Sequence, residues 1–217
     1  MPVRAAIWQA VETSYKRYNL RVDDFIDWKY GIKTSLIEQY DQAQSEQTKF
    51  QDPSANRPTS VSYLLELRRV LSPSMNDIFM DLGCGTGRAV FVFARSDVRL
   101  AKGVDFGDLA YECCMDNLHR YRYDKTKIEF RKVDVCSVQF GDETIFFLAN
   151  PFGIKTLNVV MSNLQANLKA NPRPIRLCYF NPLHSQFLDG LPWLRRKCEL
   201  KSFKNCILIY ENILDLQ

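Results

Sequence analysis

The sequence predicts an α/β protein built on an open, mostly parallel sheet. From about residue 77 onward, short apolar runs alternate with stretches of helical periodicity, which is the pattern of consecutive βαβ units. Several of these runs are apolar at every position, as expected of parallel strands that are covered on both faces. Three of only nine glycines, Gly83, Gly85 and Gly87, fall within five positions directly after the first run. A ligand-binding turn of such a sheet would lie there.

The N-terminal part of the chain is predicted to be helical. Apolar residues recur at helical spacing from Ala6 to Tyr18, a second stretch at 25–30 ends at Gly31, and a third covers about 35–49. Residues 51–60 have the composition of a loop, and Thr59 or Ser60 is expected to cap a helix at 63–71. We therefore divide the chain into an N-terminal helical segment, residues 1–57, and an α/β domain, residues 58–217.

The α/β domain is predicted to contain seven strands. They are expected at 78–82, 100–104, 127–133, 144–149, 175–180, 198–203 and 207–213, with helices at 88–95, 108–123 and 154–169. The last two strands flank Lys204-Asn205, which is typical of an antiparallel hairpin at the edge of a sheet. The predicted fold is thus a mostly parallel seven-stranded sheet with an antiparallel C-terminal hairpin, preceded by N-terminal helices.

The composition is that of an ordinary folded protein. Hydrophobic residues make up 46% of the chain and charged residues 25%, which excludes an intrinsically disordered chain. No stretch approaches the roughly 20 apolar residues of a membrane helix, and no long apolar run follows the first four residues, so we expect neither a membrane partner nor a secretory signal. A net charge of +4 is too small to indicate a nucleic-acid partner by itself.

The cysteines indicate a reducing compartment. The chain has seven cysteines and two histidines, and the adjacent pair Cys113-Cys114 does not have metal-ligand spacing. We therefore expect free thiols, a cytoplasmic location and no bound metal.

The most informative motif follows the first predicted strand and reads Asp81-Leu82-Gly83-Cys84-Gly85-Thr86-Gly87-Arg88. Glycines let the backbone turn sharply into a helix and let a ligand approach it closely. Dinucleotide-binding proteins use G-x-G-x-x-G, whereas here the third glycine comes one residue early and Arg88 takes its usual position. The spacing G-x-G-x-G behind an acidic residue resembles motif I of class I S-adenosylmethionine-dependent methyltransferases. The resemblance implies a Rossmann-like fold, S-adenosyl-L-methionine as cofactor, and a loop that packs against its methionine part.

The same resemblance implies further cofactor-binding residues. Asp105 ends the second strand, where the family places an acid that accepts hydrogen bonds from both ribose hydroxyls. Phe106 is expected to pack either on the adenine or in the core. Asp134 follows the third strand, where the family places an acid that accepts from the adenine amino group. The implied cofactor set is Asp81, Gly83, Cys84, Gly85, Gly87, Asp105, Phe106, Asp134, Val135, Asn150 and Thr59, with Cys84 as a small spacer and Thr59 upstream of motif I.

The fourth predicted strand ends in Asn150-Pro151-Phe152-Gly153, where the family places the methyl acceptor. In methyltransferases that act on an amino nitrogen, this position often reads Asn-Pro-Pro followed by an aromatic residue. The resemblance implies Asn150, Pro151 and Phe152 as catalytic residues that hold a target amine and stack on a planar substrate, although the chain is one proline short of the pattern. The alternative is a plain Asn-Pro turn. A second Asn-Pro ends the fifth strand, and nearby His184 is either a general base or structural.

The resemblance covers roughly residues 58–217. The combined motifs resemble a group of uncharacterised bacterial class I methyltransferases and, more remotely, class I lysine methyltransferases in which an Asn-rich turn ends the fourth strand. They imply in-line methyl transfer to a nitrogen of a protein or small-molecule acceptor, with nucleic acid not excluded. The alternatives are an inactive S-adenosylmethionine-binding module and a nicotinamide-dependent oxidoreductase, which Arg88 disfavours.

The N-terminal helices have two interpretations. They carry six aromatic residues up to Tyr30, more than small surface helices need. One hypothesis makes them a lid that excludes water, with residues 28–30 and 57–59 lining the mouth of the pocket. The other has them cover one face of the sheet.

Overall fold

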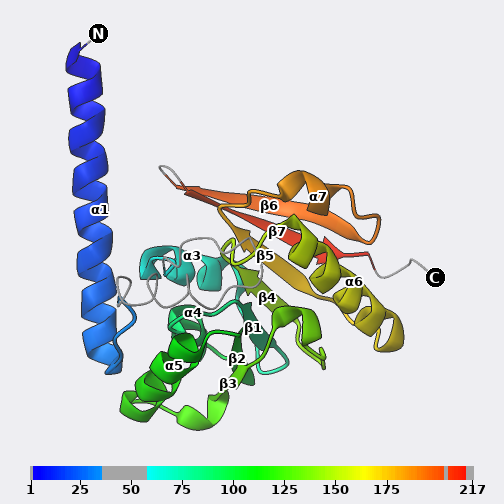
Figure 1. Ribbon diagram of the computed structural model, residues 1–217. Coiled ribbons are helices and arrows are strands. Elements are labelled where there is room, and N and C mark those ends of the chain that lie inside the picture. The colour runs from blue at the N-terminus through cyan, green and yellow to red at the C-terminus, as the bar shows by residue number, and fades with distance from the viewer. Residues whose placement is uncertain (1, 36–57, 203–204, 214–217) are drawn as a thin grey trace.

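The computed structural model describes residues 2–35, 58–202 and 205–213 and shows a seven-stranded sheet between two helical layers (Figure 1). The strands are β1 (Ile78–Leu82), β2 (Leu100–Asp105), β3 (Ile128–Lys132), β4 (Ile145–Leu148), β5 (Arg176–Phe180), β6 (Leu194–Ser202) and β7 (Asn205–Asn212). The helices are α1 (Pro2–Tyr30), α3 (Val61–Leu71), α4 (Arg88–Phe93), α5 (Asp108–Arg120), α6 (Ile154–Ala170) and α7 (Ser185–Asp189), with 3₁₀ turns at Lys125–Lys127 and Val135–Ser137.

The sheet has the topology that the sequence predicts. Its strand order is β3-β2-β1-β4-β5-β7-β6. β1 to β5 pair in parallel, and β7 runs antiparallel to both β5 and β6. The chain reverses its direction of progress across the sheet between β1 and β4. Open α/β sheets bind ligands at the carboxyl ends of the strands beside such a point.

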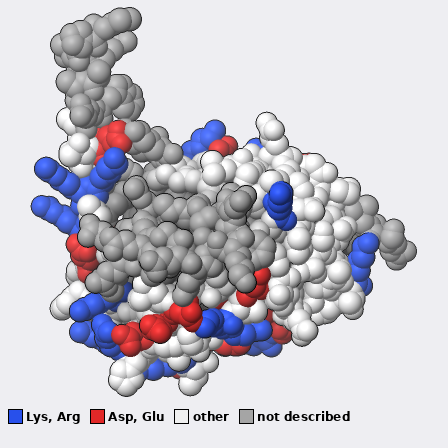
Figure 2. Space-filling model, viewed as in Figure 1, with Lys and Arg blue, Asp and Glu red and all other residues white. Residues whose placement is uncertain are grey.

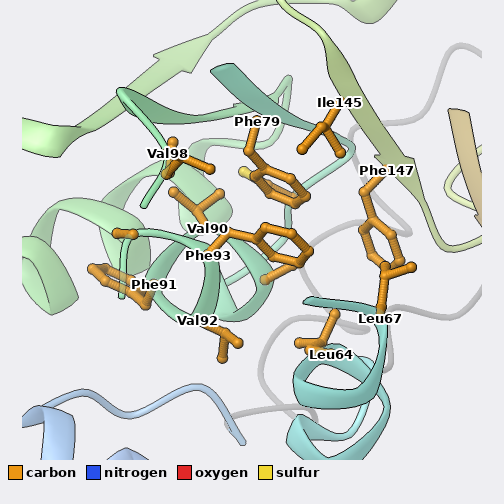
Figure 3. Packing of buried hydrophobic residues seen from close by; sticks show 14 of the residues in the cluster. Leu64, Leu67, Phe79, Val90, Phe91, Val92, Phe93, Val98, Ile145 and Phe147 are labelled. Atoms are coloured by element: carbon orange, nitrogen blue, oxygen red, sulfur yellow. The ribbon is translucent and has the colours of Figure 1, made fainter. Parts of the chain in front are cut away.

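Two apolar clusters hold the helices against the sheet. On one face, α3 and α4 pack on β1 and β4, and the ring of Phe79 stacks on that of Phe93 with centroids 3.9 Å apart (Figure 3). Tyr30 and Ile32, at the end of α1 and just after it, belong to this same cluster. On the other face, the buried side of α6 packs on Met80, Phe146 and their neighbours. Side chains of alternate residues in β1 and β4 therefore point to opposite faces of the sheet, as expected of parallel strands that are buried on both faces.

The N-terminal helix differs from its prediction. The two stretches expected at 6–18 and 25–30 form one continuous helix, because no glycine or proline lies between them. The helix ends at Gly31 as predicted, with a φ of 77°. The third predicted stretch, 35–49, lies outside the described residues except for Ser35. The proposed boundary at residue 57 stays a prediction.

The N-terminus of helix α3 is capped by a residue of another helix. Ser60 is the residue before its first turn, but the Ser60 side chain makes no cap hydrogen bond. Instead, Asp23 of α1 accepts hydrogen bonds from the backbone N–H of Val61 at 2.7 Å and from the Ser60 hydroxyl at 2.9 Å. The carboxylate thus takes the place of the predicted cap, and the helix begins two residues earlier than expected. None of the described helices is long and apolar enough to cross a bilayer.

Candidate functional site

The glycine loop joins β1 to α4 at the carboxyl edge of the sheet. Gly83, Gly85 and Gly87 have φ values of 81°, 52° and 84°, which disfavour any residue with a side chain. A Cβ atom placed on Gly83 would lie 2.3 Å from the Cβ of Pro151. The loop therefore lies directly against the Asn-Pro turn after β4, and the fold brings the two predicted motifs into contact.

Asp105, the last residue of β2, holds the glycine loop through hydrogen bonds to its carboxylate. Its two carboxylate oxygens accept hydrogen bonds from the backbone N–H of Gly85 at 2.9 Å and of Gly107 at 3.0 Å. The backbone N–H groups of Gly83 and Cys84 also donate to β2, at the carbonyl of Val104. The carboxylate predicted to meet a ribose thus lies at the glycine loop.

Asp81 is a buried carboxyl group beside this loop. It is 4% exposed, and among the described residues neither a hydrogen-bond donor nor a cation acts on its pKa. Burial, together with the negative charge of Asp105, raises the pKa of Asp81 well above its ordinary value. A strongly perturbed carboxyl group at the ligand-binding edge of a sheet is typical of a functional site, because a positively charged ligand group would stabilise its ionised form.

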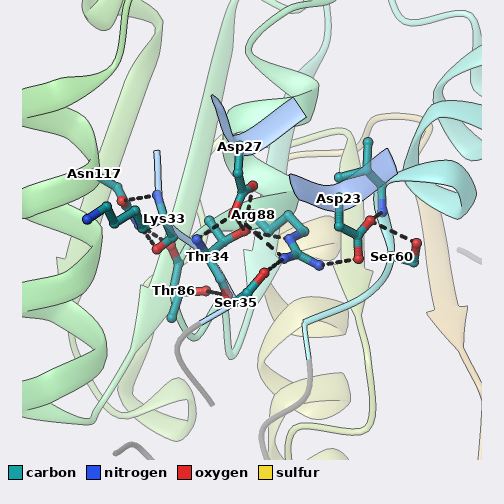
Figure 4. A network of polar contacts seen from close by, with 10 residues as sticks. Asp23, Asp27, Lys33, Thr34, Ser35, Ser60, Thr86, Arg88 and Asn117 are labelled. Atoms are coloured by element: carbon teal, nitrogen blue, oxygen red, sulfur yellow. Dashed lines mark hydrogen bonds and ion pairs between the residues drawn. The ribbon is translucent and has the colours of Figure 1, made fainter. Parts of the chain in front are cut away.

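Arg88, the first residue of α4, is the centre of a buried polar network (Figure 4). Its guanidinium group is almost fully buried and forms an ion pair with Asp23 at 2.9 Å. It also donates to the hydroxyls of Thr34 at 2.6 Å and Ser35 at 2.9 Å, and lies 3.8 Å from Asp27. Asp27 in turn accepts hydrogen bonds from the N–H and hydroxyl of Thr34. From the sequence, Arg88 stood out only as the residue in place of a third dinucleotide glycine, because its partners lie more than fifty residues away.

The segment after α1 crosses the glycine loop and is fixed on both sides. The hydroxyl of Thr86 donates to the carbonyl of Thr34 at 3.0 Å. The side chain of Asn117 on α5 exchanges hydrogen bonds with the backbone of Lys33 and donates to the carbonyl of Thr86. Residues 33–35 are therefore part of the support of the loop. Tyr30 packs edge-on against Tyr121, so it belongs to the core, whereas the lid hypothesis placed it at the mouth of the pocket.

The other predicted cofactor residues lie around the same edge. Phe106 is about half exposed, directly after β2. Asp134 uses one carboxylate oxygen to cap the 3₁₀ turn that begins at Val135, through the N–H of Cys136. Thr59 is buried, and its hydroxyl oxygen has no hydrogen-bond partner among the described residues.

The two Asn-Pro turns lie side by side and hold each other. Asn150 and Asn181 both have positive φ, 51° and 45°. The side-chain amide of Asn150 donates to the carbonyl of Asn181 and accepts from the N–H of Leu183 at 3.2 Å. The Asn150 side chain is thus directed to the neighbouring turn. Phe152 is half-buried against the α6 side of the core, and His184 precedes α7.

A chain of polar contacts extends from these turns to α1. Asn181 donates to the side chain of Asn205 at 2.7 Å, and Asn205 donates to the hydroxyl of Tyr63 at 2.9 Å. Tyr15 on α1 contacts both Tyr63, at 2.8 Å, and Ser202, at 2.7 Å. The middle of α1 therefore contacts the β6–β7 hairpin, and its C-terminal end contacts the support of the glycine loop.

Cys84 fits the predicted role of a small spacer. A Cβ atom on Gly103 would lie 2.8 Å from its sulfur, so the thiol fills the gap between loop and β2. The neighbouring Cys114, which donates to the carbonyl of Gly85, and burial raise the pKa of Cys84 well above its ordinary value. A raised pKa disfavours the thiolate, which is the reactive form of cysteine, and so does not favour a nucleophile at this position. All seven cysteines are unbridged.

No family model and no curated protein matches this sequence. Solved structures do match its fold. An RNA methyltransferase from Salinibacter ruber, in complex with S-adenosyl-L-homocysteine, is 14% identical with a TM-score of 0.54 over 74% of this chain and 97% of that chain. Ribosomal protein L11 methylase from Lactobacillus delbrueckii subsp. bulgaricus is 13% identical, with a TM-score of 0.54 over 70% and 77% of the two chains. The yhhF protein of Escherichia coli, thought to be a methyltransferase, is 14% identical, with a TM-score of 0.58 over 76% and 91%. The predicted Rossmann-like fold is thereby confirmed.

Proposed function

We propose that this protein is an S-adenosylmethionine-dependent methyltransferase. The observation that carries the proposal is the position of two carboxylates, Asp81 and Asp105, on either side of a three-glycine loop at the carboxyl edge of the sheet. Asp81 supports it most directly, because a buried carboxyl group without a donor among the described residues calls for a positively charged ligand group. The fold it shares with solved methyltransferases adds support.

The residues present fit this cofactor. Asp81 would meet the ammonium group of its methionine part. A carboxylate accepts up to about four hydrogen bonds, so Asp105 would serve a ribose hydroxyl as well as the loop backbone. Phe106 would cover the adenine with its exposed ring, and Asp134 and Val135 would lie at its edge. The loop can approach the ligand closely because its glycines present no side chains.

Asn150, Pro151 and Phe152 would form the acceptor side. When bound, the cofactor would supply a sulfonium-activated methyl group: the bond from methyl to acceptor nitrogen would form as the bond from methyl to sulfur breaks, S-adenosyl-L-homocysteine would leave, and the proton of the nitrogen would go to solvent. The protein's contribution is mainly alignment. The Asn150 amide is engaged with the neighbouring turn, so we propose that it acts chiefly by fixing the backbone between the two Asn-Pro turns. Pro151 then fixes the distance from acceptor to cofactor, because it lies against Gly83.

The acceptor belongs to one of several classes. A nitrogen of a protein or small molecule is the expectation from the motif, and the structural neighbours include both an RNA methyltransferase and a ribosomal protein methylase. An odd number of cysteines, seven, without metal-ligand spacing favours a reducing compartment such as the cytoplasm.

Two alternative functions remain testable. A nicotinamide-dependent oxidoreductase is disfavoured because the side chain of Arg88, at the position of the third dinucleotide glycine, is committed to the α1 network. An inactive binding module would bind the cofactor without turnover. The experiment is incubation of the protein with tritiated S-adenosylmethionine and fractionated cell extract. Label that enters a macromolecular or small-molecule fraction supports the proposal, and tight binding without any transfer would instead favour the inactive module.

A further inference from the structure

One face of α1 exposes aromatic side chains to solvent. Tyr18, Phe25 and Trp28 are 61%, 55% and 66% exposed. With Arg21 they follow the spacing 18, 21, 25, 28, which places all four on the same side of a helix. We call these four residues the outer face of α1. The opposite side carries Tyr15, Asp23, Asp27 and Tyr30, which contact the rest of the molecule.

The border of the outer face is mainly positive, with one exposed carboxylate, Asp24, beside Arg21 and Trp28. Arg17 and Lys29 lie beside it on α1, and Arg122 lies with its guanidinium carbon 5.9 Å from the centre of the Trp28 ring. None of these three, nor Arg21, forms an ion pair within the described part of the chain. Figure 2 shows Lys and Arg side chains projecting from the middle of α1, the helix that Figure 1 shows extending away from the body of the molecule.

We infer that the outer face of α1 binds single-stranded RNA. Rings stack on exposed bases without strong sequence preference, and arginines between them bind the phosphates. A second copy of the chain fits less well. Pairing two outer faces antiparallel about their common centre would set Arg17 of one copy against Lys29 of the other, and parallel pairing would set each cation against itself. Among the described residues, Arg17, Arg21, Lys29 and Arg122 outnumber Asp24, the exposed carboxylate beside them on α1, and this excess of positive charge favours a polyanion.

The face is connected to the candidate site. Asp27, the neighbour of Trp28, hydrogen-bonds Thr34, and Thr34 contacts both Arg88 and Thr86 beside the glycine loop. RNA held on the outer face would thus lie across α1 from Asp23 and Asp27, the residues that contact the support of the loop. RNA as the class of methyl acceptor rests on the proposed methyltransferase function. RNA binding by the outer face does not depend on that function.

The experiment measures the fluorescence anisotropy of a labelled, unstructured RNA of about 20 nucleotides with the full-length protein and no cofactor. If Arg17, Arg21, Lys29 and Arg122 each neutralise one phosphate, the logarithm of the binding constant falls with the logarithm of salt with a slope of about −3. The double variant Arg17→Gln/Arg21→Gln should reduce that slope by about 1.4. The triple variant Tyr18→Ala/Phe25→Ala/Trp28→Ala should weaken binding by at least about 25-fold if two of the rings stack on bases.

The matched control is Lys155→Gln/Lys169→Gln, which removes the same charge from exposed positions of α6 on the other face of the sheet. It should leave RNA affinity within about twofold. Equal losses in both double variants, or a salt slope near zero for the natural sequence, would overturn the inference. Sedimentation that shows a dimer lost in the triple variant, with RNA affinity unchanged, would assign the face to a second copy. Calorimetry with S-adenosylmethionine keeps the two proposals apart, because cofactor binding without RNA binding rejects only this one.

Discussion

Replacing Arg88 by methionine tests how the N-terminal helix and the glycine loop depend on each other. The change keeps much of the side-chain volume but leaves Asp23 and Asp27 buried without their cation. Breaking a buried ion pair costs about 3–5 kcal/mol. Both carboxylates keep hydrogen bonds, from Val61 and Thr34 respectively, so we expect the lower end, about 3 kcal/mol. For a chain of this length that corresponds to a melting temperature lower by roughly 6–12 °C.

The assay is thermal unfolding followed by circular dichroism, over a range of pH. Burial already raises the pKa of Asp27, while Arg88 lowers it, so the variant raises it further. A raised carboxyl pKa contributes stability that is present below the unfolded pKa and lost as pH rises through the folded pKa. The deficit of Arg88→Met should therefore shrink as pH falls through the folded pKa of Asp27.

The control for this variant is Arg95→Met, just after α4. Arg95 is exposed and lies over the ring of Tyr123 at 3.9 Å, so its loss should cost less than about 1 kcal/mol. A deficit of Arg88→Met no larger than that of Arg95→Met, or one independent of pH, would show that the buried Arg88 network does not stabilise the fold.

The remaining predictions concern single residues of the site. Gly83→Ala should destabilise the protein by about 2–5 kcal/mol in urea unfolding, because it combines a φ of 81° with the contact to Pro151, whereas Gly141→Ala, which meets only ordinary contacts, should be nearly neutral. Asp81→Asn should reduce the loss of stability with rising pH that begins near the unfolded carboxyl pKa of about 4, because the pKa of Asp81 is raised in the folded state while Asp27 still contributes in the variant. Urea midpoints of the two proteins that stay parallel at every pH would contradict this. Asn150→Gly, which tolerates the positive φ but removes the side chain, should reduce methyl transfer strongly and leave cofactor affinity within a few-fold, and equal loss of both would make Asn150 a support of the cofactor pocket instead.

The sequence was sufficient for the sheet and the loop because their signals are local. β1, for example, is an apolar run at Ile78–Leu82 followed directly by glycines, and each predicted strand was found within a few residues. The same locality placed Asp105 at the glycine loop, because the carboxyl ends of adjacent parallel strands meet at one edge.

The polar networks were not predictable because their partners are distant in sequence. Arg88 meets Asp23 across 65 positions, and no spacing rule connects them. The cap of α3 comes from Asp23 for the same reason, although Ser60 is a good cap by type. The side chain of Asn150 turns to Asn181, 31 residues later, and its direction depends on two backbone turns with positive φ that sequence alone does not specify.

The most direct test of the proposed function is a calorimetric titration with S-adenosylmethionine of the natural sequence and of Asp105→Ala, with Asp142→Ala as control. Asp142 is an exposed carboxylate paired with Arg99, so its removal takes away a charge without touching the site. We predict that one cofactor binds per chain, that Asp105→Ala binds it about 10- to 100-fold more weakly, and that Asp142→Ala binds it unchanged. No binding by the natural sequence, or equal affinity in all three proteins, would contradict it.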